Sequence, residues 1–193
     1  MTEKKLNTVR INAGEWRSRL IKFLDAPGLR PTPERVRQTV FNWLGQDLTG
    51  LNCLDLFAGT GVMGFEALSR GALALTLVEK SLVACQALFA NKQLLKAEAA
   101  NILHQDALQF LNKNTLKFNI IFLDPPYQQG WLPKVLPLLT AHLHAEGLVY
   151  VEAEYALDVA QPNTTFNFSS DWEIIKQSKA GNVFYHLLKS TKN

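Results

Sequence analysis

Short apolar runs alternate with stretches of helical character along the middle of the chain. The apolar runs, rich in β-branched residues, predict strands at residues 51–57, 73–78, 102–104, 118–123 and 147–151. Helices are predicted between these strands, at residues 81–95, 107–111 and 131–143, and within 58–70, where a glycine-rich loop opens the helix. Strands that alternate with helices in this way predict an α/β fold with a doubly wound, mostly parallel sheet.

The N-terminal part departs from this alternation. Residues 8–11 and 19–23 have strand character and flank the turn signal at residues 12–15, which predicts a β-hairpin. Thr32 is then expected to N-cap a helix that has Pro33 at its first position. The apolar residues of that helix recur at helical spacing and should face the core: Val36, Val40, Phe41 and Leu44.

The C-terminal part also changes character. Residues 172–179 and 183–189 are β-rich and flank Ala180-Gly181-Asn182, which predicts a terminal hairpin with antiparallel strands. We expect a single domain, in which residues 1–31 form an N-terminal extension and residues 32–193 form the core.

Composition excludes several classes of protein. The chain has 193 residues, of which 47% are hydrophobic and 19% charged, as in ordinary globular domains. It has no apolar run of about 18 residues and no apolar segment behind Met1, so we expect neither a membrane span nor a secretory signal. Cys53 and Cys85 lack the spacing of a disulfide framework or zinc site. We therefore expect buried thiols, no metal and a cytoplasmic location.

Basic residues are concentrated at the N-terminus. The net charge is only +3, but residues 1–37 hold nine Lys or Arg against four acids. This excess predicts contact with a polyanion, although a solvated charged terminus is the alternative. Trp16, near the hairpin tip, could stack on a nucleobase or pack on the body, and the helix start at Thr32 could hold a phosphate. The basic candidates, expected to point outward, are Arg10, Arg17, Arg19, Arg30, Arg35 and Arg37.

The sequence Asp124-Pro125-Pro126-Tyr127 directly follows the predicted strand 118–123. Ligands of open α/β sheets bind at this carboxyl edge. Asp124 can accept a hydrogen bond from an exocyclic amino group, and the prolines leave carbonyl groups free to accept another. Tyr127 offers a flat face for a base. An amine held in this way could attack an electrophilic methyl group, whereas the simpler alternative is a Pro-rich turn with a surface Asp.

A glycine-rich loop follows the first core strand. Gly59-Thr60-Gly61-Val62-Met63-Gly64 matches G-x-G-x-x-G and has Glu79 about 20 residues further on, so a dinucleotide site must be considered. Asp55 and Asp106 favour another ligand, because acids suit an ammonium group and an adenine amino group better than a pyrophosphate. S-adenosylmethionine has these groups, although Asp106 could instead be a helix N-cap. The candidate cofactor residues are Asp55, Phe57, Ala58, Gly59, Thr60, Gly61, Glu79, Asp106 and Ala107.

Together these motifs resemble a known family. Asp55–Gly61 and Asp124–Tyr127 resemble the class I S-adenosylmethionine-dependent amino-methyltransferases, which have a Rossmann-like fold. Residues 10–17, 28–37, 41–44, 66–72 and 179–182 narrow the resemblance to the RsmD-type 16S ribosomal RNA (guanine(966)-N2)-methyltransferases. The resemblance implies a seven-stranded sheet with an antiparallel last strand, and RNA contacts at Lys179 and Asn182.

The resemblance also implies an activity, namely methyl transfer from S-adenosylmethionine to the exocyclic N2 of a guanine in small-subunit ribosomal RNA. It further implies action during ribosome assembly, on RNA that already carries proteins, and we expect the enzyme to be a monomer. Two rivals are a DNA adenine-N6 methyltransferase, which can share the tetrapeptide, and a non-catalytic RNA-binding assembly factor.

Overall fold

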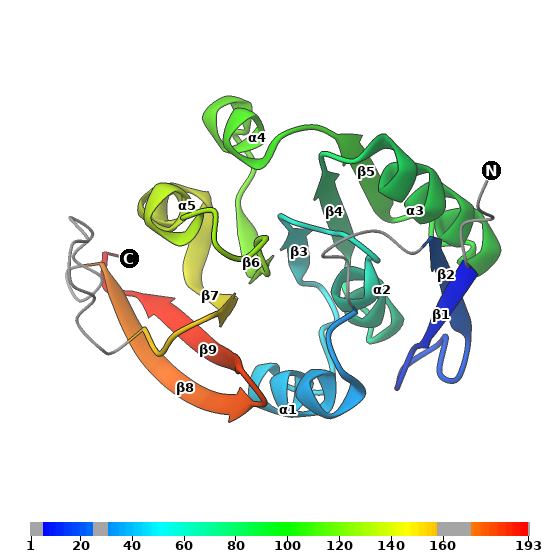
Figure 1. Cartoon of the computed structure of the whole chain (residues 1–193), viewed down its shortest axis with the longest axis horizontal. Helices are drawn as coiled ribbons and strands as arrows, with labels where there is room; N and C mark the ends of the chain where they lie inside the picture. Colours follow the sequence, from blue (N-terminus) through cyan, green and yellow to red (C-terminus); the bar gives the residue numbers. More distant parts are fainter. Residues whose placement is uncertain (1–5, 25–30, 158–170, 193) are drawn as a thin grey trace.

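A seven-stranded sheet forms the centre of the molecule (Figure 1). The computed structural model describes residues 6–24, 31–157 and 171–192. The strand order is β5-β4-β3-β6-β7-β9-β8. The strands are β3 (Asn52–Asp55), β4 (Ala74–Glu79), β5 (Ala100–His104), β6 (Phe118–Leu123), β7 (Leu143–Ala153), β8 (Trp172–Ala180) and β9 (Val183–Ser190).

The order in which the chain adds strands to the sheet reverses at the middle of the sheet. From β3 the chain runs outward through β4 to β5, and it then returns to β6 on the other side of β3 and continues to β7. These five strands are parallel, whereas β9, the last strand of the chain, pairs antiparallel with both β7 and β8. The predicted doubly wound, mostly parallel sheet with an antiparallel last strand is confirmed. Its switch point lies between β3 and β6, where such folds bind ligands.

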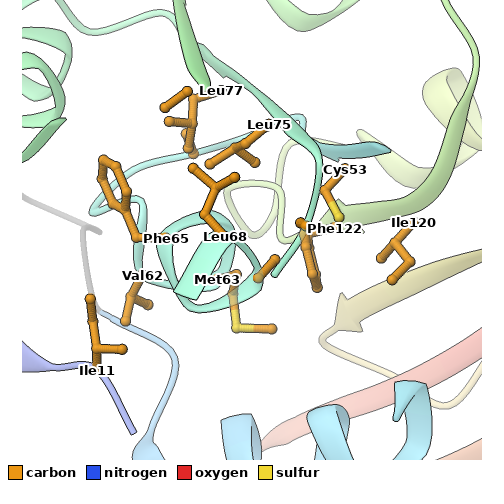
Figure 2. Packing of buried hydrophobic residues seen from close by; sticks show 14 of the residues in the cluster. Ile11, Cys53, Val62, Met63, Phe65, Leu68, Leu75, Leu77, Ile120 and Phe122 are labelled. Atoms are coloured by element: carbon orange, nitrogen blue, oxygen red, sulfur yellow. The ribbon is translucent and has the colours of Figure 1, made fainter. Parts of the chain in front are cut away.

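Helices cover both faces of the sheet, because the central strands are apolar on both faces. Along β6, Ile120 and Phe122 join one core cluster, whereas Ile121 and Leu123 join the other. The first cluster includes residues of α1 (Glu34–Leu44), α2 (Val62–Ser69) and α3 (Leu82–Leu95), and Figure 2 shows part of it. The second includes residues of α4 (Ala107–Lys113) and α5 (Leu132–Leu139), which is followed by the short 3-10 helix η1 (Thr140–His142).

The predicted N-terminal hairpin is present as a separate two-stranded sheet, β1 (Leu6–Arg10) and β2 (Leu20–Leu24). It lies beside α3 (Figure 1), where the Asn91 side chain bonds to both the N–H and the carbonyl of Lys22. The loop between the strands reaches α2. Gly14 there has φ +82°, and a Cβ atom would lie 1.7 Å from the Ser69 carbonyl oxygen, so only glycine fits. The hairpin is therefore docked on the body.

Several local expectations need correction. Helix α1 begins at Glu34 with Pro33 as its N-cap, so Thr32 is not the cap that its sequence position predicts. Arg17 lies in a turn and Arg19 precedes β2, so the strand predicted from residue 19 begins at Leu20. Both cysteines are free and buried, as expected. In the described parts of the chain, no helix is long and apolar enough to cross a membrane.

Candidate active site at the carboxyl edge of the sheet

Four acids gather where the parallel strands end. Asp55 is the last residue of β3 and Glu79 the last of β4, Asp124 directly follows β6, and Glu152 is the penultimate residue of β7. Because the carboxyl ends of parallel strands meet at one edge of the sheet, these side chains surround the switch point. Among the described residues, no group of three His, Cys, Asp or Glu side chains is arranged to hold a metal ion.

The glycine loop forms a tight turn between β3 and α2. Gly61 is the N-cap of α2 in the left-handed region, with φ +75°, and a Cβ there would lie 2.4 Å from the Leu88 side chain. Glu79 lies against this loop. Its Oε2 accepts the N–H of Gly59 at 2.8 Å, and its Oε1 accepts the N–H of Ser81 at 2.6 Å. The acid is thus held at the loop, where the sequence predicts a ligand.

Asp55 is buried beneath the same loop. Its Oδ2 accepts the N–H of Gly64 at 3.2 Å. Burial raises the pKa of Asp55 to about 7, and the nearby acids Glu79 and Glu152 add to the rise, although the bond from Gly64 opposes it. A bound cation, such as a ligand ammonium group, would compensate this buried carboxylate.

The remaining candidate cofactor residues lie in the loop after β3 and at the start of α4. Asp106 is the N-cap of α4, with Oδ1 accepting the N–H groups of Leu108 and Gln109, so the N-cap alternative is confirmed. Its role toward an adenine amino group stays a prediction. Around the loop, Ala58, Thr60 and Ala107 are buried, whereas Gly59 and Phe57 are partly exposed.

The tetrapeptide Asp124–Tyr127 leaves β6 at the centre of this edge. Pro125 is buried, Pro126 is exposed, and Tyr127 is 39% exposed, which leaves its ring available for stacking. Burial raises the pKa of Asp124 well above its ordinary value, with further contributions from the charges of Glu152 and Asp55. Asp124 is therefore a better proton acceptor than a solvated aspartate.

Sequence reasoning missed Glu152, which is only 4% exposed. Its Oε1 accepts hydrogen bonds from the Tyr150 hydroxyl at 2.7 Å and the Thr32 hydroxyl at 3.0 Å. Burial raises the pKa of Glu152, although these two bonds oppose the rise. A signal was available, because Glu152 directly follows the predicted strand 147–151 just as Asp124 directly follows 118–123.

A pocket opens beside the tetrapeptide, over the ends of β6 and β7. Among its lining residues are Pro125, Pro126, Tyr127, Trp131, Glu152 and Tyr155. The ring of Trp131 packs edge-on against Phe57, with centroids 5.2 Å apart. Phe57 belongs to the segment that leads into the glycine loop, so this aromatic contact connects the loop to the wall of the pocket.

The predicted RNA-binding residues divide into exposed and buried groups. Arg10, Arg17, Arg19 and Arg35 are exposed, as are Lys179 and Asn182 at the β8–β9 turn, and Arg30 lies outside the described residues. Trp16 is only 7% exposed and joins the core, so it packs on the body and does not offer a face to a nucleobase. Thr32 is 5% exposed and its hydroxyl donates to Glu152, so its side chain is not available to RNA, whereas a phosphate at the backbone N–H groups of the helix start stays a prediction.

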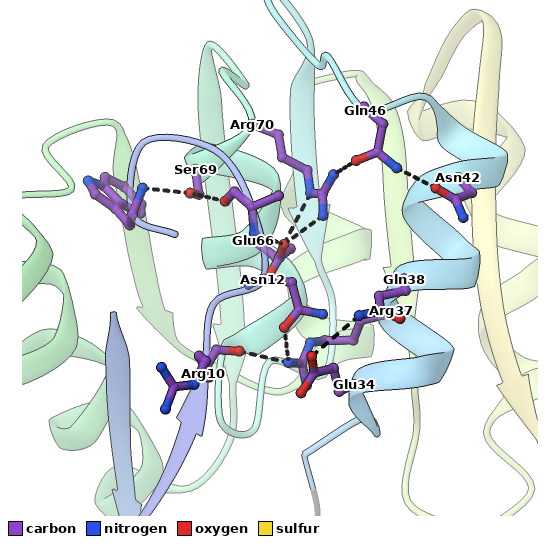
Figure 3. Close-up of polar contacts among 12 residues, drawn as sticks. Arg10, Asn12, Glu34, Arg37, Gln38, Asn42, Gln46, Glu66, Ser69 and Arg70 are labelled. Atoms are coloured by element: carbon purple, nitrogen blue, oxygen red, sulfur yellow. Dashed lines mark hydrogen bonds and ion pairs between the residues drawn. The ribbon is translucent and has the colours of Figure 1, made fainter. Parts of the chain in front are cut away.

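Arg37 was expected to point outward, and this expectation is wrong. The side chain is 1% exposed and donates to the carbonyl oxygens of Thr32 and Arg10 at 2.6 and 2.7 Å, and to Asn12 Oδ1 at 2.9 Å. Figure 3 shows Arg37 reaching from α1 to the hairpin. A second anchor is Glu66 of α2, which accepts the N–H groups of Asn12 and Ala13. These buried polar groups fix the hairpin and are not available to RNA.

Comparison with known proteins gives consistent matches over nearly the whole chain. The family model described as conserved hypothetical protein 95 matches residues 9–189. The chain is 40% identical over 181 residues to ribosomal RNA small subunit methyltransferase D of Escherichia coli K12, covering 93% of this chain and 88% of that protein. It is 38% identical to the Haemophilus influenzae protein of the same name, covering 94% of each.

A solved structure has the same fold. The Escherichia coli protein yhhF, named as a methyltransferase, superposes with a TM-score of 0.79 at 39% identity, covering 95% of this chain and 98% of that one. These relatives decide between the two interpretations of the glycine loop. They are methyltransferases, so the alternative of a nicotinamide dinucleotide site is set aside.

Proposed function

The chain belongs to the family described as conserved hypothetical protein 95, together with ribosomal RNA small subunit methyltransferase D, and we propose that it methylates a guanine of small-subunit ribosomal RNA. It is an enzyme of the methyltransferase class. In the proposed reaction, S-adenosylmethionine is the methyl donor and the exocyclic N2 of the guanine is the acceptor, at position 966 as the family resemblance implies. The substrate is RNA within assembling small-subunit particles, and the enzyme acts as a cytoplasmic monomer.

The residues around the glycine loop fit S-adenosylmethionine. Gly59 and Gly61 both have positive φ, and the tight turn they form brings backbone close to the carboxyl edge. Two backbone N–H groups hold the Glu79 carboxylate at the loop, and in this proposal Glu79 accepts the ribose hydroxyls. Asp55 gives the ammonium group a buried counter-charge, and Asp106 lies one strand further along for the adenine.

The chemical step needs positioning more than a strong base. When bound, S-adenosylmethionine supplies a methyl group on a sulfonium, whose sulfur leaves with the electron pair of the broken carbon–sulfur bond. Asp124 and the Pro125 carbonyl accept hydrogen bonds from the guanine amino group and turn its lone pair toward that methyl. As the nitrogen–carbon bond forms, one amino proton becomes acidic and passes to Asp124 or to water. The raised pKa of Asp124 favours that late transfer.

The other side chains bring the RNA to this point. Tyr127 stacks the extruded base, which enzymes that modify bases must take out of the RNA structure. The exposed Arg10, Arg17, Arg19 and Arg35 contact phosphates, and Lys179 and Asn182 add contacts from the β8–β9 turn. Phosphate contacts position the RNA without reading its sequence.

The observation that carries the proposal is the placement of Asp124–Tyr127 between the glycine loop and a pocket at the carboxyl edge. The test compares small-subunit RNA by mass spectrometry from cells with and without this protein. We expect one N2-methylguanine to be lost in the cells without it. Purified enzyme with tritiated donor should label small-subunit particles and not duplex DNA. Labelling of DNA adenine would support the DNA-methyltransferase rival, and an absence of all labelling would support the non-catalytic rival.

A further inference from the structure

Asp124, which is half-buried, and the buried Glu152 lie next to each other because of the strand register. Leu123 of β6 pairs with Val151 of the parallel strand β7. Asp124 directly follows Leu123 at the end of β6, and Glu152 follows Val151 within β7, so the two backbones continue side by side at about 4.8 Å, the spacing of neighbouring strands. Glu152 lines the pocket together with Pro125 and Tyr127. A base that stacks on Tyr127 and presents its amino group to Asp124 therefore has Glu152 beside the same edge.

The carboxylate of Glu152 is held in a fixed orientation. The hydroxyls of Tyr150 and Thr32 both donate to Oε1, at 2.7 and 3.0 Å. Neither of them bonds Oε2. The carboxylate has no proton to donate when it is ionised, so it can only accept from a substrate. What Glu152 recognises must therefore be a donor that lies next to the amino group held at Asp124.

Guanine is the RNA base with this arrangement of donors. Its Watson–Crick edge carries N1–H directly beside the N2 amino group. Adenine and cytosine instead carry a ring-nitrogen acceptor beside their amino group, and uracil has no amino group. A lone pair facing a carboxylate is repelled, and a buried acceptor without a donor is costly. Extruded bases are commonly read through hydrogen bonds on this edge.

We infer that Glu152 selects guanine by accepting its N1–H, while Asp124 and the Pro125 carbonyl hold the N2 amino group. This inference rests on the proposed function and adds the residue that determines which base is accepted. Tyr150 and Thr32 are positioning residues, because they act on the base only through Glu152. The selection involves no covalent step. The N1–H of guanine donates a hydrogen bond to Glu152, and the proton stays on the base.

The Glu152→Gln substitution tests the selection directly. The two hydroxyls would still donate, so the amide oxygen takes the place of Oε1 and the amide NH₂ takes the place of Oε2. The pocket would then present a donor where the native protein presents an acceptor. The kcat/KM for guanine should fall on the order of ten- to a hundredfold, as expected for the loss of one hydrogen bond to a charged group.

A base analogue separates selection from general damage. The substrate is a small-subunit particle in which the methylated guanine, mapped beforehand, is replaced by 2-aminopurine. This base keeps the N2 amino group but has a lone pair at N1, and it lacks the guanine oxygen O6. Wild-type enzyme should prefer guanine, and Glu152→Gln should lower the guanine-to-2-aminopurine ratio of kcat/KM by at least about tenfold. The missing oxygen affects both enzymes alike and cancels in this comparison.

Controls make each outcome decisive. Glu98→Gln, an exposed acid between α3 and β5, should leave the ratio unchanged, and calorimetric titration with S-adenosylmethionine should show that Glu152→Gln still binds the donor. An unchanged ratio in Glu152→Gln would overturn the selection while guanine methylation by the wild type still stands. If the variant does not fold, equal use of both bases by the wild type overturns the inference. If the wild type methylates no guanine at all, the proposed function itself fails.

Discussion

Arg37 is the residue whose structural role differs most from its sequence pattern, and Arg35, two positions earlier on α1, is its natural control. We predict that Arg37→Met destabilises the protein, whereas Arg35→Met leaves its stability nearly unchanged. Both substitutions keep the helix propensity and much of the side-chain volume. Arg37 is 1% exposed and bonds three oxygens, whereas Arg35 is exposed.

The magnitude follows from those contacts. A hydrogen bond to a charged group contributes about 1.5–3 kcal/mol, and acceptors left unpaired in a buried site add to the loss. Burial of the Arg37 guanidinium has a desolvation cost, which is why the pKa of Arg37 is lowered in the native protein. Removing the charge recovers part of that cost. We therefore expect a net loss of about 2–4 kcal/mol for Arg37→Met and less than about 0.5 kcal/mol for Arg35→Met.

Urea unfolding of the cofactor-free protein measures the difference, followed by far-UV circular dichroism. With a slope of about 2 kcal/mol per molar urea, the midpoint of Arg37→Met should fall by about 1–2 M relative to Arg35→Met. Equal midpoints for the two variants would refute the buried anchor. Arg37 would then be a surface residue, as its charge predicts, and the hairpin would need another attachment.

Four further predictions concern the site and the RNA contacts. Asp124→Ala should abolish methyl transfer while calorimetry still shows donor binding, and activity within about tenfold of wild type would contradict the assigned role. Glu79→Ala should weaken donor affinity about ten- to a hundredfold, because ribose hydroxyls lose a charged acceptor, and unchanged calorimetric affinity would exclude that contact. Replacing Arg10, Arg17 and Arg19 together by Ala should flatten the dependence of log affinity for the ribosomal particle on log salt by about 2–3, as three lost phosphate contacts require, and superimposable slopes would remove their role in binding RNA. The pKa of Asp55 is raised from 3.8 to about 7 on folding, so the stability linked to its protonation is present below about pH 4 and is lost as the pH rises through 7. Asp55→Asn should therefore raise stability by about 2–3 kcal/mol more at pH 8 than at pH 5, and an equal effect on urea unfolding at both pH values would contradict the raised pKa.

The fold and half of the site follow from local sequence patterns. Strand β6 spans residues 118–123 as predicted, because a continuous apolar run is buried on both faces of a parallel sheet. The alternation of strands and helices then places the carboxyl ends of the five parallel strands at one edge. The acids at residues 55, 79 and 124 were therefore predictable as neighbours, although they are far apart in the sequence.

The residues that the sequence misplaced are those whose partners are distant. Arg37 is four and seven residues before Phe41 and Leu44, so helical spacing puts it on the core-facing side of α1, and only its charge predicts that it points outward. Its burial depends on carbonyl and amide oxygens of Arg10 and Asn12, more than 20 residues away. Trp16 is likewise packed into a core cluster, and its backbone N–H donates to the hydroxyl of the distant Ser69. No periodic pattern encodes such contacts, because they depend on how separate elements dock.

Thr32 connects the two functional parts of the molecule. Its carbonyl accepts from Arg37, which also holds the backbone of the hairpin at Arg10, and its hydroxyl donates to Glu152 in the pocket. The distance from the hairpin to the pocket is thus spanned by buried hydrogen bonds, which are costly to break. Contacts to phosphates are blind to sequence, so they can deliver one particular base only if their positions are fixed relative to the pocket. The path from Arg10 through Arg37 and Thr32 to Glu152 supplies that fixed relation.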